Sequence, residues 1–407
     1  MKLFAKLIVV CLLVTLLFSA CTPPITPQPS VEVSTSQPTP TETTSPTDSP
    51  EPPTDTPLPT AESQDPPTSP TPLAFGPEQF PANVDPLTGQ ILGDAAILER
   101  RPVATKIQIF PRGQRPTWGL NNADIVFDFY QNNGLTRLHT IFYGQDAATV
   151  GPIRSARLLD VDLIKMYKSI FAFGGAEYRT RTRLFNADFA DRLVVEGYNM
   201  CPPLCRVDPN GYNYLVANTA ELTKYADQKG IDNSRQDLDG MSFSEIAPDG
   251  MQADQIFIRF SISAYSRWDY ELANNRYLRF QDTAEAYDVA SEIYDAFTDR
   301  DTGAQIAADN VVVLIVPHEF AFGTSPGPGE VVDMRLTGSG KAYAFRDGRV
   351  YQVTWNKPSN TSVISLAFPD GRPYPLNPGN TWFEIIGQSS KVEQPEQDIW
   401  RFTFQIP

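Results

Sequence analysis

Two arginines precede a helical segment in a way that suits the binding of an anion. Residues 151–157 read Gly-Pro-Ile-Arg-Ser-Ala-Arg, and residues 156–168 follow with helical spacing of apolar side chains. Ser155 is a favourable N-cap residue, and the free N–H groups of a helix start attract negative charge together with nearby guanidinium groups. We therefore predict that Arg154 and Arg157 form an anion site. Pairing of both with Asp128, Asp160 or Asp162 is the structural alternative.

A hairpin just before this segment is expected to add a third arginine. Asn133-Gly134 separates two alternating runs, which is a strong signal for a tight turn. Asp128 then lies opposite His139 with a two-residue turn, or opposite Arg137 with a four-residue loop from Gln131. In either register Asp128, Arg137 and His139 share one face, since side chains alternate along a strand. A solvated surface with a cross-strand ion pair explains the same pattern. The other face, assigned to the core, would carry Phe127, Phe129 and Leu138.

Glu177 and Asp128 are the candidates for proton transfer if the site performs a reaction. Glu177 follows Gly174-Gly175, where the backbone could approach a ligand closely. Asp124 and Asp128 do not form a glycosidase pair by themselves. Residues four apart on a strand are separated by about 13 Å at ~3.3 Å per residue, whereas such pairs need about 5–9.5 Å.

The first 20 residues predict export from the cell. Lys2 and Lys6 precede an apolar run from residue 7 to 18, and Ser19-Ala20 stand before Cys21. The run is shorter than the about 20 residues of a membrane-spanning helix, which indicates a cleaved signal peptide over residues 1–20. The arrangement resembles a bacterial lipoprotein signal, with an ordinary secretory signal as the alternative. We expect an extracytoplasmic protein anchored to the bacterial cell membrane by lipid on Cys21.

Residues 21–90 are predicted to hold the lipidated cysteine and a disordered tether rich in Pro, Thr and Ser. Residues 22–72 carry 16 of the 37 prolines and no Lys, Arg or aromatic residue. Such a stretch has too little apolar surface to offset the entropy of ordering and favours extended polyproline II. A Pro-rich docking ligand is the functional alternative.

The charge of the chain argues against nucleic acid as a partner. The formal net charge is −15, and residues 73–407 alone carry −10 because Lys2, Lys6 and seven carboxylates precede them. Binding to nucleic acid depends on clustered Lys and Arg that neutralise phosphates. Any anion bound by this protein must therefore meet a local basic site.

Cys201 and Cys205 are expected to form a disulfide in an oxidising compartment. Two prolines after Cys201 would turn the chain and bring the cysteines together. A metal site is not expected, because structural zinc usually takes four Cys or His ligands and the only histidines, His139 and His318, are remote in sequence. No cofactor is expected.

The folded region is predicted to be α+β, with a mixed α/β domain at residues 91–245 and a β-rich domain at 250–407. Before residue 240, strand patterns at 103–109, 125–130 and 135–143 and a short apolar run at 170–173 alternate with helix patterns. Strand patterns with turn pairs dominate afterwards. About 310 residues also exceed what one core usually holds. Aromatic residues are mostly core, but a sugar-stacking platform in the second domain is a further possibility. Its members would be Trp268, Trp355 and Trp382.

The chain resembles the YerB-like lipoproteins, a family with two consecutive modules of unknown function, over about residues 95–390. The N-terminal pattern is carried by Arg101-Pro102-Val103-Ala104, Gly119-Leu120, Ala123-Asp124-Ile125-Val126, Gly134-Leu135-Thr136-Arg137 and residues 151–157. The second module is similar at Trp268, Tyr277-Leu278-Arg279, Gly338-Ser339-Gly340, Gly348, Trp355, Lys357 and Pro378-Gly379-Asn380-Thr381-Trp382. The resemblance implies the fold, export and the position of the site, but no reaction.

The chain departs from that family pattern at two positions. Family members usually carry Glu where this chain has Asp128, and a Pro-His-Asn element where it has Gly211-Tyr212-Asn213. Asn213 is thus retained as a candidate ligand-binding residue while the imidazole is lost. A reaction that needs this imidazole would be absent here.

These observations favour a membrane-anchored lipoprotein that binds an anionic cell-envelope polymer or glycan. The ligand-binding residues would be Arg137, Arg154, Arg157, Asp128, Glu177 and Asn213. The alternative is a glycan-processing enzyme of the cell envelope in which Glu177 or Asp128 transfers protons and the arginines hold an anionic group. A purely structural or partner-binding role is the third possibility.

Overall fold

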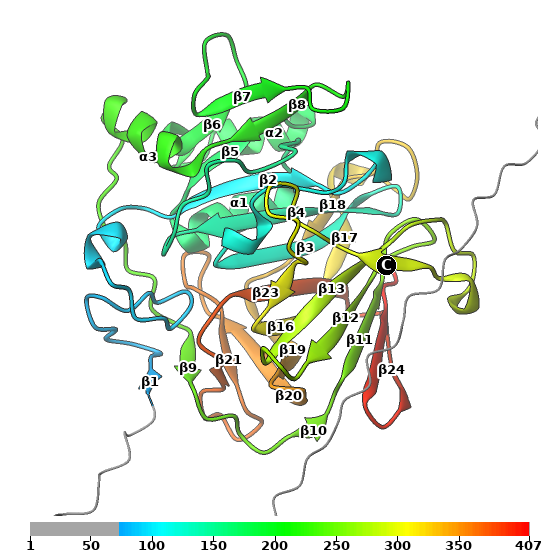
Figure 1. The fold of residues 1–407 in the computed structure, drawn as a ribbon. Coiled ribbons are helices and arrows are strands. Elements are labelled where there is room, and N and C mark those ends of the chain that lie inside the picture. Colours follow the sequence, from blue (N-terminus) through cyan, green and yellow to red (C-terminus); the bar gives the residue numbers. More distant parts are fainter. Residues whose placement is uncertain (1–72, 407) are drawn as a thin grey trace, which may run out of the picture. The chain divides into compact units, whose positions relative to one another are not determined.

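The computed structural model describes residues 73–406, and strands dominate them (Figure 1). Three α-helices occur in these residues, and all of them precede residue 230. They are α1 (Leu158–Tyr167), α2 (Tyr178–Phe185) and α3 (Thr219–Gln228). This arrangement agrees with the predicted α+β class. Cys21 and the predicted signal peptide lie outside the described residues, as does most of the predicted tether.

The larger sheet has eleven strands in the order β10-β20-β19-β16-β23-β3-β4-β2-β5-β6, with β21 paired to β20. Its strands from the first half of the chain are β2 (Val103–Gln108), β3 (Ile125–Asn132), β4 (Leu135–Phe142), β5 (Ile170–Phe173) and β6 (Leu193–Val195). Those from the second half are β10 (Met251–Gln252), β16 (Asn310–Val316), β19 (Gly338–Arg346), β20 (Arg349–Lys357), β21 (Ser365–Ala367) and β23 (Thr381–Gly387). The parallel pair β23–β3 joins the two halves. The larger sheet is therefore continuous across the two halves of the chain. The domain boundary at residues 245–250 remains a prediction.

The smaller sheet has seven strands in the order β14-β13-β12-β11-β25-β24, with β15 paired to β13. Its members are β11 (Gln255–Arg259), β12 (Tyr265–Glu271), β13 (Arg276–Asp282), β14 (Tyr294–Ala296), β15 (Ala307–Ala308), β24 (Lys391–Glu396) and β25 (Ile399–Thr403). The remaining strands are β1 (Ala74–Phe75), β7 (Leu204–Val207), β8 (Tyr214–Ala217), β9 (Ser242–Ser244), β17 (His318–Phe320), β18 (Val332–Met334) and β22 (Pro375–Leu376). Short 3-10 turns lie at Ala95–Leu98, Arg112–Gln114, Leu120–Asn122, Ala190–Arg192, Val289–Ser291 and Ala321–Gly323.

The two faces of the larger sheet are covered by different elements. On one face, Phe127 of β3 lies 5.9 Å from Tyr167 of α1 between ring centres. On the other face, Trp382 of β23 meets Trp268 of β12 edge to face at 5.1 Å. Helix α1 therefore packs on one side of the central strands, and the smaller sheet packs on the other. This layering decides which side chains can reach the predicted site.

The three tryptophans of the expected sugar platform belong to the core. Trp268, Trp355 and Trp382 are each at most 1% exposed. Burial of large aromatic rings is the usual outcome for such residues. A stacking platform formed by these rings is therefore excluded.

The β3–β4 hairpin has the predicted turn, but a bulge changes its register. Asn133 and Gly134 both have positive φ, at 53° and 75°, as a tight two-residue turn requires. The pairing shifts between Tyr130 and Asn132, so that Gln131 is an extra residue on one strand. Asp128 consequently pairs with Leu138, and Arg137 pairs with Phe129.

The prediction that Asp128, Arg137 and His139 share a face is therefore wrong. A shift of one residue moves a whole strand's side chains to the opposite side. Arg137 and His139 face α1 together with Phe127 and Phe129. Asp128 faces the smaller sheet, with Leu138.

Candidate functional site

Arg137 of β4 and Arg157 converge on the same short segment of backbone. The Arg137 Nη1 donates to the Ser155 carbonyl at 2.7 Å, and the Arg157 Nη1 donates to the carbonyls of Ser155 at 3.3 Å and Ala156 at 2.9 Å. The Arg157 Nη2 donates to the Gln131 side chain at 2.8 Å. The bulge residue of the hairpin thus orients one arginine, and both guanidinium groups are held close together.

Residues 153–156 run as an extended segment beside the ends of β2 and β5. The Arg154 N–H donates to the Lys106 carbonyl at 2.8 Å, and Gly174 N–H donates to the Arg154 carbonyl at 3.1 Å. A Cβ on Gly174 would lie 3.5 Å from the Arg154 Cα. This distance is an ordinary van der Waals contact, so the Arg154 segment packs directly on residue 174.

Helix α1 begins two residues later than predicted, and Ser155 is not its N-cap. Arg157 is the N-cap residue, and its N–H donates to Asp160 Oδ2 at 2.5 Å. The start of the helix is therefore compensated by its own carboxylate. The predicted anion site at the helix N–H groups is wrong in that respect, and the guanidinium groups are what the structure leaves for an anion.

Asp160 lies between a buried lysine and a buried histidine. Its Oδ1 lies 3.0 Å from Lys106 Nζ and 2.8 Å from His139 Nδ1, and all three side chains are inaccessible. Burial raises the pKa of Asp160, but the lysine and histidine outweigh this and hold it at about 2. Burial lowers the pKa of Lys106 to about 7 although Asp160 opposes the shift. The Asp160 carboxylate is thus shared between Lys106, His139 and the Arg157 N–H, and it forms no salt bridge with the arginine side chains.

The arginines lack carboxylate partners among residues 73–406. None of Arg137, Arg154 and Arg157 forms a salt bridge there, and their side-chain partners are backbone carbonyls and glutamines. Burial, together with the charges of Arg157 and Arg154, lowers the pKa of Arg137 to about 9, although Asp160 opposes the shift. These guanidinium groups are partly desolvated and form no salt bridge. An incoming anion would therefore stabilise their charged form.

Arg154 lies beside this pair but extends toward a different group of residues. Its Nε donates to Gln108 Oε1 at 3.0 Å, and Arg206 and Glu196 act on its charge. Arg206 and Glu196 form a salt bridge with each other, and Arg206 also donates to the Asn213 carbonyl at 3.0 Å. The three arginines are therefore neighbours, with Arg137 and Arg157 as the convergent pair.

Asn213 is exposed in the turn between β7 and β8, with φ of 49°. Its N–H donates to Asp208 Oδ1 at 3.1 Å. Its link to the arginines runs only through Arg206, so the structure places it beside the candidate site rather than inside it. The disulfide between Cys201 and Cys205 is present and links the turn before β7 to that strand, with the Cα atoms 4.6 Å apart.

Asp128 is outside the candidate site. Its Oδ2 accepts from Arg279 Nη2 at 2.6 Å between the two sheets, and both side chains are 1% exposed. Arg279 also donates to Glu384 Oε1 at 3.1 Å. The prediction that Asp128 borders the arginine site is therefore wrong, because the bulge turns this side chain to the opposite face.

Glu177 lies at the edge of the arginine pair but serves as the N-cap of α2. Its carboxylate accepts from the N–H groups of Arg179 at 2.9 Å and Thr180 at 3.1 Å, and from Arg179 Nε at 2.7 Å. Slight burial raises the pKa of Glu177, but these hydrogen bonds outweigh it and lower the pKa overall. Glu177 is thus ionised at neutral pH and is poorly suited to donate a proton.

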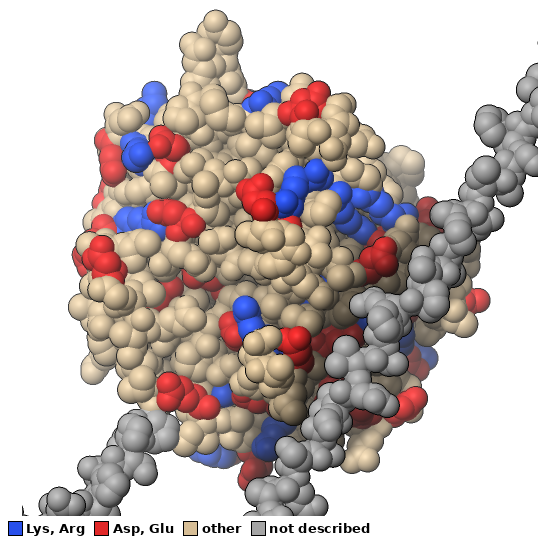
Figure 2. All heavy atoms as spheres, in the orientation of Figure 1, with Lys and Arg blue, Asp and Glu red and all other residues tan. Residues whose placement is uncertain are grey.

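Helix α2 adds a basic and aromatic surface that sequence patterns did not single out. Arg179, Arg181 and Arg183 alternate with Thr along it. Beside them, the exposed fraction is 78% for Tyr178, 41% for Phe185 and 47% for Phe322. The bridge between Ala156 and Ala176 places the start of this helix next to the arginine pair. The alternating Arg-Thr-Arg-Thr-Arg run was the available signal. On the face drawn in Figure 2, by comparison, basic and acidic side chains are mostly interspersed.

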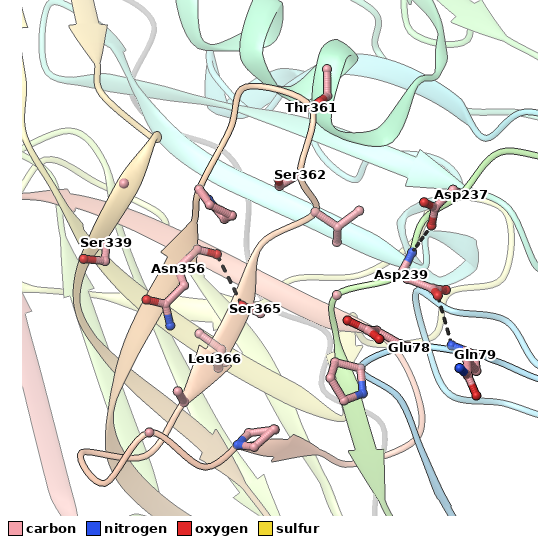
Figure 3. Close-up of a pocket in the computed structure, with 18 of the residues that line it drawn as sticks. Glu78, Gln79, Asp237, Asp239, Ser339, Asn356, Thr361, Ser362, Ser365 and Leu366 are labelled. Carbon is pink, nitrogen blue, oxygen red and sulfur yellow. Dashed lines mark hydrogen bonds between the residues drawn. The ribbon is translucent and has the colours of Figure 1, made fainter.

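A large cavity of about 980 Å³ lies away from the arginines (Figure 3). One side carries Glu78, Asp237 and Asp239, and the other carries Asn356, Ser365 and Leu366. Asp239 Oδ2 accepts from the Gln79 N–H at 3.0 Å. The acidic side makes this cavity unsuited to an anionic ligand. It is therefore separate from the predicted site in both position and charge.

Comparison with known proteins assigns the chain to a family. Residues 87–232 match the N-terminal domain, and residues 256–383 the C-terminal domain, of a family described as a protein of unknown function (DUF3048). The chain belongs to this DUF3048 family. The predicted resemblance to YerB-like lipoproteins is confirmed, because the chain is 30% identical over 310 residues to "Putative lipoprotein YerB" of Bacillus subtilis (strain 168). That match covers 74% of this chain and 85% of the relative.

The fold of this DUF3048 protein is similar to a solved structure from the same relative. The crystal structure of YerB protein from Bacillus subtilis matches with a TM-score of 0.59 and 25% sequence identity. The match covers 74% of this chain and 96% of the solved chain. In the residues described for this protein, no helix is long and apolar enough to cross a membrane.

Proposed function

We propose that this DUF3048 protein is a membrane-anchored extracytoplasmic lipoprotein that binds an anionic cell-envelope polymer or glycan. The name of the B. subtilis relative supports the lipoprotein character, as does the sequence start with Cys21 after an apolar run. Lipid on Cys21 would supply the membrane affinity, since the signal peptide is cleaved. The binding surface would be the convergent pair Arg137 and Arg157 with Arg154 beside them.

The lack of a salt bridge to these arginines, among the residues that the structure describes, is the observation that carries the proposal. The guanidinium groups share carbonyl acceptors and meet no carboxylate of residues 73–406 within salt-bridge distance. The protein as a whole has a net charge of −15 and repels anions. Attraction is therefore confined to the surroundings of these arginines. Planar guanidinium groups suit carboxylate and phosphate, both of which are present in anionic polymers.

Helix α2 supports a polymer rather than a single small anion as the ligand. Its three arginines and exposed aromatic rings continue the basic surface beyond Glu177. Cationic groups interleaved with aromatic rings would contact both the charges and the apolar faces of a repeating ligand. The enzyme alternative has less support, because Asp128 faces away and Glu177 is committed to capping α2.

Replacing Arg137 and Arg157 together with Gln is expected to weaken the binding of an anionic polymer at least about tenfold, since each charged hydrogen bond contributes roughly 1.5–3 kcal/mol. The full chain would be sedimented with isolated cell-wall material. It would also be titrated with polyphosphate and with polyglutamate, which separate phosphate recognition from carboxylate recognition. Arg372→Gln, which removes an exposed arginine paired to Asp370, is the matched control.

A second variant tests polymer binding at exposed residues whose replacement should not unfold the protein. Arg181→Gln with Arg183→Gln changes exposed side chains of α2 and is expected to weaken polymer binding about severalfold at low salt with little change in melting temperature. Normal polymer binding by a folded Arg137/Arg157 double variant would contradict the proposal, as would equal losses in the Arg372 control.

A further inference from the structure

A second, smaller cavity of about 240 Å³ lies between the two halves of the chain and is lined only by polar residues. None of its lining residues belongs to the arginine pair or to α2. The first half contributes Thr88, Gln90, Asn121, Asp124 and Gln145, and the second half contributes Arg276, Asp309 and Asn380. A fully polar lining indicates a site for a hydrogen-bonding molecule rather than an apolar one.

Asp124 supplies a buried acceptor on one wall of the cavity. The residue is 3% exposed, and its Oδ2 accepts from the N–H groups of Tyr143 and Gly144, the latter at 3.1 Å. The described residues offer no donor to its Oδ1. Asp124 lines the cavity, so this oxygen is available to a donor from a ligand or from solvent.

The Asp124 carboxyl group lies next to that of Asp85. A Cβ on Gly144 would lie 2.6 Å from Asp85 Oδ2 and 3.5 Å from Asp124 Oδ1, so both oxygens approach the same point. Asp85 Oδ2 also has no partner. Burial raises the pKa of Asp85 to about 6, while burial and the Asp85 charge raise the pKa of Asp124. The pair therefore holds a proton in mildly acidic solution, and Asp124 can donate as well as accept.

The opposite wall presents a fixed guanidinium group. Arg276 Nε lies 3.0 Å from Asp309 Oδ1, and its Nη2 donates to Asn380 Oδ1 at 3.0 Å. Asn380 in turn donates to the Ala307 carbonyl at 3.0 Å. Among the described residues, nothing accepts from Arg276 Nη1. The cavity therefore has a free donor on one wall and a free acceptor on the other.

We propose that this cavity binds one small polyhydroxylated molecule, such as a single sugar unit. Hydroxyl groups both donate and accept, so they can satisfy Asp124 and Arg276 at once, with the side chains of Gln90 and Gln145 at the rim. At about 30 Å³ per water, the volume corresponds to roughly eight waters, which suits one sugar unit and not a polymer.

Other ligand classes fit the cavity less well. Asp309 neutralises Arg276. Its carboxylate also repels a phosphate or carboxylate group, whether that group belongs to an anion or to a zwitterion. The part of the chain that the structure describes has no group of three His, Cys, Asp or Glu side chains that could hold a metal ion. The proposal does not depend on the arginine site, and either could fail alone.

The test is binding of single sugars to the full chain in detergent, by saturation-transfer NMR. Glucose, N-acetylglucosamine and glycerol serve as hydroxyl probes, and glycine and inorganic phosphate serve as the zwitterionic and anionic probes. At least one sugar is expected to bind in the millimolar range. Gln145→Trp places a bulky ring at the exposed rim and is expected to weaken that binding at least about tenfold. Gln397→Trp, at the exposed turn between β24 and β25, should leave it unchanged.

Asp124→Asn provides the second readout. The Asn side chain has the same shape, but only one of its two terminal atoms can accept a hydrogen bond. It is expected to weaken sugar binding and to leave polyphosphate binding by the arginines intact. Unchanged sugar binding in Gln145→Trp would overturn the proposal. So would binding of glycine or phosphate in preference to every sugar, or the absence of sugar signals from a folded protein.

Discussion

Replacing Arg279 with Met is expected to lower the free energy of unfolding by about 3–5 kcal/mol at neutral pH. Arg279 is 1% exposed and bonds Asp128 at 2.6 Å and Glu384 at 3.1 Å between the two sheets. Its guanidinium also lies over the ring of Trp382, 4.5 Å from the ring centre. Removal of the cation leaves the buried Asp128 carboxylate without compensation and removes a donor to Glu384. Urea denaturation of the parent and the variant measures the loss.

Two further variants separate the lost charge from lost packing. Arg372→Met removes an exposed arginine and is expected to change the free energy of unfolding by less than about 1 kcal/mol. Adding Asp128→Asn and Glu384→Gln to Arg279→Met removes both carboxyl groups and should restore much of the stability. A loss below about 1 kcal/mol in Arg279→Met would show that this cluster contributes little to holding the sheets together.

The strands were largely predictable because their sequences alternate or form short apolar runs. The expected strands at 103–109, 125–130 and 135–143 correspond to β2, β3 and β4, and the run 170–173 is β5. The side on which their residues lie was less predictable. Gln131 looks like any other strand residue, yet its place as a bulge depends on tertiary packing, and it reverses the face of Asp128.

The site was found in part because arginine clusters and glycine pairs are visible in sequence. Arg137 and Arg157 do meet beside the start of α1, but through the Ser155 carbonyl rather than around free helix N–H groups. The capping preference of Ser did not decide the helix start, because Asp160 caps from within the helix. The cavity between Asp124 and Arg276 could not be foreseen, since the two residues are 152 positions apart and meet only when β23 joins β3.

The contribution of Glu384 to stability is expected to fall as pH rises from about 4.5 to about 8, and Glu384→Gln should remove that contribution. Burial raises the pKa of Glu384 to about 8, because Arg279 only partly offsets it and the Asp128 carboxylate adds to it. In this range the folded protein retains a proton that the unfolded chain releases. Folding is therefore favoured at the acidic end, by roughly 1.4 kcal/mol per pH unit at most, and the effect levels off above pH 8.

Glutamine imitates the protonated carboxyl group, so the variant should gain stability relative to wild type as pH increases, with the largest gain near pH 8. The measurement is the free energy of unfolding in urea at pH 5, 6, 7 and 8 for both proteins. The difference between the two free energies of unfolding reports on Glu384 alone, because Asp85 and Asp124 are present in both proteins. Asp128→Asn is the matched control. It leaves Glu384 paired with Arg279 and without a neighbouring carboxylate, so it too should flatten the profile. A difference that stays constant across this range would mean that Glu384 is ionised in the folded protein and that Arg279 compensates both carboxylates.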